Sequence, residues 1–69
     1  MKVWTQGQTA EAENYAATMF NSEKEARVDA EIQIKEEGVA SVYIWPNRID
    51  ETWGNQPDYS SDFMDIISN

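Results

Sequence analysis

Carboxylates are the side chains of this sequence that could do chemistry, because Asp and Glu number 13 against 5 Lys and Arg. Two acidic pairs are conspicuous, Glu36-Glu37 and Asp50-Glu51, but adjacent side chains tend to diverge. An acid–base pair also needs a cleft that shifts a pKa, and a chain of 69 residues encloses little space. We therefore interpret the acids as solvated surface groups and expect no catalytic residue.

Other kinds of chemistry lack the residues that they need. His and Cys are absent, which removes the usual general base, the commonest transition-metal ligand and any disulfide. The Ser hydroxyls have no His to activate them, and the three glycines are too scattered for a phosphate-binding loop. Asp58, Asp62 and Asp65 lack the alternating spacing of a calcium loop. We expect no enzymatic activity, no cofactor and no metal site, which leaves binding as the function.

The net charge of −8 restricts the partners of the protein. This charge repels phosphate groups, so we expect neither direct binding to nucleic acid nor association with anionic membranes. No stretch near Met1 has the apolar region of a signal peptide, and we expect a cytoplasmic protein. A domain of this size has a small core, which disulfides, metals or a partner subunit usually supplement. Because disulfides and metals are not expected here, a homodimer remains an open alternative.

The apolar residues suit a sheet, because Leu is absent and Val, Ile and aromatic residues replace it. Alternation predicts short strands over residues 2–5, 15–20 and 39–45. In the last of these, Val42 and Ile44 face one side and Tyr43 and Trp45 face the other. Those aromatic side chains lie on an open face, unless the apolar residues of 63–67 fold back over them or two copies of the chain pair there.

A helix is predicted over residues 23–37. Ser22 and Glu25 have the spacing of a capping box, and Gly38 stands where a helix would close. Apolar residues also alternate through 26–35, as they do in a strand. The alternative fold is therefore an N-terminal helix followed by a β-hairpin made of residues 26–35 and 39–45.

The expected fold class is α+β, with the order β-β-α-β, a small antiparallel sheet and one covering helix. Residues 1–69 form a single domain, in which 1–49 are the core and 50–69 an acidic, aromatic C-terminal tail. We expect residues 48–57 to be a loop, followed by a short helix near 60–67 with Ser60 or Ser61 as its N-cap. The run Phe20-Asn21-Ser22-Glu23-Lys24-Glu25-Ala26, with Ala30 and with Gly38 before Val42-Tyr43-Ile44, resembles small bacterial ββαβ domains of unknown function. That resemblance covers residues 15–50 and implies a fold without an activity.

In size, charge and lack of catalytic residues, the chain is similar to phage-encoded anti-CRISPR and anti-restriction proteins. The similarity implies an inhibitor that occupies the nucleic-acid site of a basic, nucleic-acid-handling partner. On a terminal helix Asp58, Asp62 and Asp65 would form one acidic stripe, with a rise of about 6 Å per four residues that resembles phosphate spacing. The expected partner-binding residues are acids and tryptophans: Glu36, Glu37, Trp45, Asp50, Glu51, Trp53, Asp58, Asp62 and Asp65. The alternative function is a small dimerising structural module whose acidic surface serves solubility.

Overall fold

The computed structural model describes residues 1–68, which form one helix and five strands in the order β-β-α-β-β-β. The elements are β1 (Val3–Gln8), β2 (Thr18–Phe20), α1 (Glu23–Gln33), β3 (Ser41–Asp50), β4 (Gly54–Pro57) and β5 (Asp65–Ser68). The α+β class is as expected. The expected order is not, because two further strands follow β3 in place of a loop and a helix. Within residues 1–68, no helix is long and apolar enough to cross a membrane.

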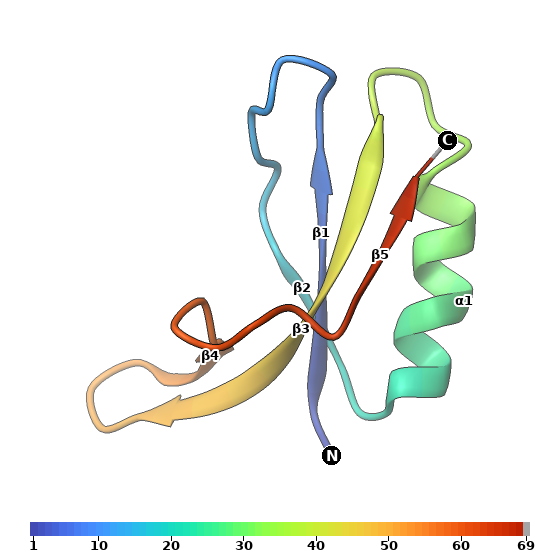
Figure 1. The fold of residues 1–69 in the computed structure, drawn as a ribbon. Coiled ribbons are helices and arrows are strands. Elements are labelled where there is room, and N and C mark those ends of the chain that lie inside the picture. The colour runs from blue at the N-terminus through green and yellow to red at the C-terminus, as the bar shows by residue number, and fades with distance from the viewer. Residues whose placement is uncertain (69) are drawn as a thin grey trace.

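Strand β3 is the longest strand and connects all parts of the sheet. Its first half pairs with β1 along one edge, from Ser41 opposite Gln8 to Pro46 opposite Val3. Along its other edge the first half pairs with β5 and the second half with β4. Strand β2 pairs with the outer edge of β1, and every pairing is antiparallel. Figure 1 shows the β3–β4 hairpin leaving the rest of the sheet and extending away from α1.

Helix α1 covers one face of the sheet and encloses the core. Ala26, Ala30 and Ile34 of the helix side are buried against the sheet residues Val3, Val42 and Ile44. Two alanines at the contact let the helix approach the strands closely, since a small side chain keeps the two backbones near each other. The partly buried residues Phe20, Val39, Met64 and Ile67 complete this core. Val42 and Ile44 thus share one side of β3, as the alternation predicts, and the structure shows that this side faces the helix.

The helix begins where the sequence predicts and ends earlier. Ser22 is the N-cap, and its Oγ accepts a hydrogen bond of 3.2 Å from the Glu25 backbone N–H. The helix stops at Gln33, and the residues after Ile34 form turns. Gly38 has a φ of +90° and belongs to the turn that leads into β3. The predicted end near residue 37 is thus wrong by one turn of helix, and the alternative strand over 26–35 does not form.

Strand β3 continues through Pro46, where the sequence predicts that it stops. Proline interrupts a ladder because it has no N–H to donate. Here the outer edge of β3 changes partners at Pro46, from β5 to β4. The Pro46 carbonyl accepts from the Asp58 N–H at 2.8 Å, and a donor is not needed at this junction. Residues 48–50, expected to be a loop, are therefore the end of a strand.

The chain after Pro57 folds back over the aromatic face of the sheet, but only in part as the sequence-based alternative had it. The Phe63 ring meets the Tyr43 ring edge-on with centroids 5.0 Å apart, and Tyr59 meets Trp45 in the same way at 5.0 Å. The other apolar residues of the segment, Met64 and Ile67, pack against the core on the helix side instead.

The predicted helix near 60–67 is wrong. Tyr59 and Ser60 form a turn, the Met64 N–H donates to the Ile44 carbonyl at 2.7 Å, and Asp65–Ser68 pair with β3.

The first testable prediction is that the chain from Asp58 onward is needed for stability. Its removal takes away β5 and two apolar side chains of the core, Met64 and Ile67. Full burial of such a side chain contributes about 1.5–3 kcal/mol, and a domain of this size has a total stability of only about 5 kcal/mol. We expect the shortened protein to lose its cooperative thermal transition in circular dichroism.

Two point variants test whether the side-chain packing of this segment, and not only its presence, stabilises the fold. Phe63→Ala removes two edge-on ring contacts and should lower the melting temperature by about 4–8 °C, which corresponds to about 1 kcal/mol. Ser68→Ala changes an exposed side chain of β5 in the same segment and should change stability by less than about 0.5 kcal/mol. If the truncated protein melts at the same temperature as the full-length protein, the residues from Asp58 onward do not stabilise the sheet.

Candidate functional site

The acids that the sequence marks for partner binding lie at two ends of the molecule. Glu36 and Glu37 are exposed in the turn before β3, whereas Asp50 and Glu51 lie at its far end. The ten residues of an extended strand span about 30 Å, so the two pairs cannot share one contact patch. The chain thus presents two separate acidic regions.

Asp65 is engaged in a partly exposed ion pair between α1 and β5. Its Oδ2 accepts from Arg27 Nη1 at 2.6 Å, while Arg27 Nε donates to Glu23 at 2.7 Å. The hydrogen bond from Arg27 lowers the pKa of the Asp65 carboxyl group, with the Ile66 N–H as a second cause. Arg27 therefore joins α1 to β5, which makes Asp65 a structural residue.

Asp58 also uses its carboxylate within the chain. It accepts from the Ser60 hydroxyl at 2.6 Å and from the Ser61 hydroxyl at 2.8 Å, and these bonds lower its pKa. Asp62 is exposed in the same connection between β4 and β5. The expected acidic stripe of Asp58, Asp62 and Asp65 does not form, because these residues lie in a turn and a strand and are not on a helix.

Trp45 lies in the sheet beneath the returning chain. Its ring stacks against Tyr43 at 5.9 Å and meets Tyr59 and Phe63 edge-on at 5.0 and 5.8 Å. The indole Nε1 is buried without a hydrogen-bond partner in residues 1–68. Trp45 is therefore covered on this face by the protein's own aromatic side chains.

The most projecting feature of the molecule is the hairpin of β3 and β4. Its base is held by Asn47, whose Oδ1 accepts from the Trp4 indole N–H at 2.7 Å and whose Nδ2 donates to Asn55 at 2.9 Å. Its turn is closed by Gly54, which has a φ of +77° that a residue with a side chain rarely adopts. At the tip Trp53 is 76% exposed, and Ile49 on the adjoining strand is 80% exposed.

Asp50 orders the hairpin turn. Its Oδ1 accepts from the Thr52 N–H at 2.8 Å and from the Trp53 N–H at 2.9 Å. These bonds lower the pKa of Asp50, that from Trp53 most, with a smaller contribution from Arg48, whose Nη2 lies 3.9 Å from the carboxylate. The carboxylate is thus ionised at neutral pH and fixes the backbone that carries the indole.

The tip therefore combines two exposed apolar side chains with acidic neighbours. Trp53 and Ile49 supply apolar area, while Asp50 and the exposed Glu51 supply negative charge. Tryptophan is the residue type most often found as an anchor in protein interfaces. Ile49 was missed by the sequence analysis, because a loop was expected there and a single apolar residue in a loop carries no signal.

The second testable prediction concerns the pH dependence of the hairpin turn. Because the folded pKa of Asp50 is depressed, its ordering effect is present above the ordinary Asp value of 3.8 and is lost as pH falls through the folded pKa. We expect the amide resonances of Thr52 and Trp53 to shift together only below pH 3.8 in an NMR titration. In Asp50→Ala these resonances should not titrate, while the melting of the core stays unchanged. A wild-type turn that titrates at or above the ordinary value would contradict this role.

Comparison of the chain with protein-family models, with curated proteins and with solved structures finds no match. The hairpin and the distribution of charge are therefore the features that indicate a function.

Proposed function

We propose that this protein is a non-enzymatic inhibitor that binds a basic, nucleic-acid-handling protein in the cytoplasm and occupies its nucleic-acid site. The observation that carries the proposal is the β3–β4 hairpin, which presents an exposed tryptophan close in sequence to the carboxylates of Asp50 and Glu51 on a protein of net charge −8. In this proposal the character of the protein is that of an anti-CRISPR or anti-restriction inhibitor.

The distribution of ion pairs supports an electrostatic role. Of the 13 carboxylate side chains, only those of Glu23, Asp50 and Asp65 have a cationic side chain within 4.0 Å among residues 1–68. The charge of the remaining acids is not offset by a cationic side chain at that distance, although Asp29 and Asp58 accept hydrogen bonds within the chain. Such a field attracts a positively charged surface and raises the rate of association.

The shape of the hairpin supports insertion into a groove. The hairpin extends away from α1 and from the core, and its tip can reach into a concave surface without collision of the rest of the domain (Figure 1). A groove that binds nucleic acid offers both basic side chains for the phosphates and apolar or aromatic surfaces for the bases. Glu51 and Asp50 would meet the former, and Trp53 and Ile49 the latter.

A second candidate function is a structural module that dimerises. The same exposed side chains, Ile49 and Trp53, could bury one another in a contact between two copies. The two functions differ in how binding responds to salt, since an apolar contact between like-charged copies strengthens as ionic strength rises, whereas an acidic protein is released from a basic partner.

The third testable prediction is that binding to basic proteins depends on Trp53. The probe is the fraction of a bacterial lysate that heparin retains, passed over the immobilised protein at increasing salt with and without double-stranded DNA. We expect retention at low salt, release as salt rises and displacement by DNA. Trp53→Ala should weaken retention of the captured protein by about 30-fold, which corresponds to the 2 kcal/mol typical of an anchor residue.

Charge reversals at two positions provide the matched control. Glu51→Lys changes the rim of the hairpin and should slow association of the captured protein, whereas Glu31→Lys makes the same change on the exposed side of α1 and should have a smaller effect. Equal effects would mean that only net charge matters. If nothing is retained, and light scattering shows a dimer that Trp53→Ala dissociates, the inhibitor proposal is wrong and the structural module is correct.

A further inference from the structure

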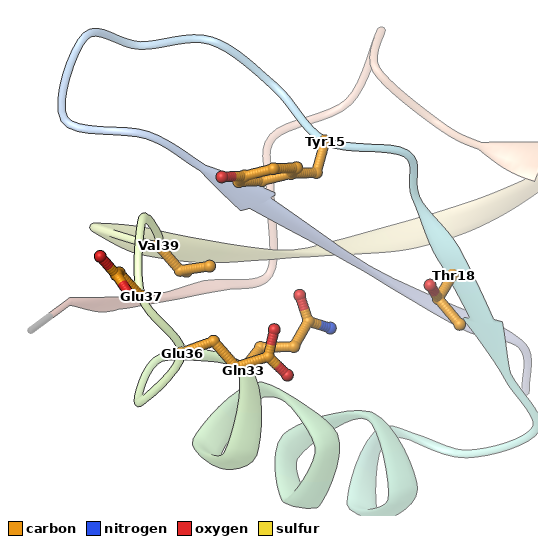
Figure 2. A pocket seen from close by; sticks show the side chains of 6 residues that line it. All are labelled: Tyr15, Thr18, Gln33, Glu36, Glu37 and Val39. Carbon is orange, nitrogen blue, oxygen red and sulfur yellow. The ribbon is translucent and has the colours of Figure 1, made fainter.

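A pocket lies at the end of the molecule opposite the hairpin, between the chain that precedes β2 and the turns that follow α1. It has a volume of about 330 Å³ and is lined by Tyr15, Thr18, Gln33, Glu36, Glu37 and Val39. In Figure 2 the Tyr15 ring is seen nearly edge-on, with Gln33, Glu36 and Val39 on one side of it. One face of the ring is therefore turned towards these residues.

Three of the residues that line the pocket pack on the bare backbone of Gly7, a buried residue of β1. A Cβ atom at this position would lie 3.2 Å from Tyr15 Cδ2, 3.3 Å from Gln33 Oε1 and 3.7 Å from Val39 Cγ1. Side chains from three separate segments thus converge on the one residue of β1 that has no side chain. The lack of a Cβ lets Tyr15 and Gln33 come this close to the strand, which sets their positions at the pocket.

The orientation of the Gln33 amide is set by a partly buried polar cluster. Gln33 Nε2 donates to Asp29 Oδ2 and, at 3.0 Å, to the hydroxyl of Thr5, which is fully buried. The Thr5 hydroxyl donates in turn to Asp29 Oδ2 at 3.3 Å. An ionised carboxylate can only accept hydrogen bonds, so the NH₂ group of Gln33 must face Asp29. Its carbonyl oxygen is left on the side of Gly7, where Gln33 lines the pocket.

The pocket therefore offers acceptors and negative charge to a ligand. Gln33 Oε1 receives no hydrogen bond from residues 1–68, and the exposed carboxylates of Glu36 and Glu37 take part in no ion pair there. The face of the Tyr15 ring adds the negative side of its quadrupole. A second depression beside this one shares Glu36 and Glu37 and adds Glu11, together with the single cation Lys35.

We infer that this pocket binds a guanidinium group, as carried by an arginine side chain. A guanidinium is planar, stacks on an aromatic face and carries five N–H donors, so it can lie against Tyr15 while it donates to Gln33 Oε1 and to a carboxylate. A metal ion fits less well, because no group of three or more potential ligands gathers anywhere in the described chain. The site goes beyond the proposed function and does not depend on it, since the hairpin lies at the other end of β3.

The test is an NMR titration of the protein alone at constant ionic strength. Methylguanidinium is the probe, urea is its uncharged planar analogue, and methylammonium is a cation that is not planar. We expect methylguanidinium to shift the resonances of Gly7, Val39 and the Gln33 side-chain amide in a saturable manner. Urea should cause no saturable shift, and methylammonium should bind several-fold more weakly.

Point variants test whether methylguanidinium binds in this pocket. Gly7→Ala places a methyl group 3.2 Å from Tyr15 Cδ2 and 3.3 Å from Gln33 Oε1, so both side chains must move and the saturable shifts should be abolished. The amide resonances of residues away from the pocket show whether this variant is folded. Glu36→Gln and Glu37→Gln should each weaken binding by roughly two- to fivefold, the range of an exposed ion pair. Glu51→Gln at the hairpin makes the same change in net charge and should leave the affinity unchanged.

Two results would overturn the inference. One is a set of methylguanidinium shifts spread over acids throughout the surface, with Glu51→Gln as effective as Glu36→Gln. The other is binding that persists in a folded Gly7→Ala variant. Neither result bears on the hairpin, so the inhibitor proposal would stand or fail by its own experiment.

Discussion

The pairing of a single ten-residue strand with three others is the constraint on which the molecule depends. Strand β3 has β1 along one edge and β5 followed by β4 along the other, so each part of the sheet is hydrogen-bonded to it or to its neighbour. Its continuity through Pro46 is essential, because a strand that ended there would leave β4 without a partner. The change of edge partner at that residue makes the missing N–H harmless.

The two faces of β3 are covered by different means. On one face the helix packs Ala26 and Ala30 against Val42 and Ile44 in a small, fully buried core. On the other face Tyr59 and Phe63, contributed by the connection between β4 and β5, cover Trp45 and Tyr43. A domain of 69 residues has too few apolar side chains for two helical layers, and the returning chain supplies the second layer at little cost in length.

The ends of β3 carry the features that a partner or ligand can reach. At one end the hairpin presents Trp53, on a turn that the Asp50 carboxylate orders. At the other end Tyr15, Gln33, Glu36 and Glu37 line a pocket rich in acceptors. Both ends carry negative charge. At the hairpin the carboxylates lie near an apolar anchor residue, whereas at the pocket they add to hydrogen-bond acceptors that favour a cation.

Much of the local structure could be predicted from the sequence. The missing residue types restrict the chemistry, Ser22 and Glu25 mark the start of the helix, and the alternation of Val42 and Ile44 with Tyr43 and Trp45 assigns the two faces of β3. These features depend on neighbours in sequence. Strands β4 and β5 could not be predicted in this way, because Gly54–Pro57 has no apolar alternation and Asp65–Ser68 suits a helix as well as a strand. Only the tertiary structure placed the acidic pairs at separate ends and brought Gly7 close to Tyr15 and Gln33. A local sequence pattern indicates which side of a strand or helix is buried. It does not indicate which residues distant in sequence will pack against that side.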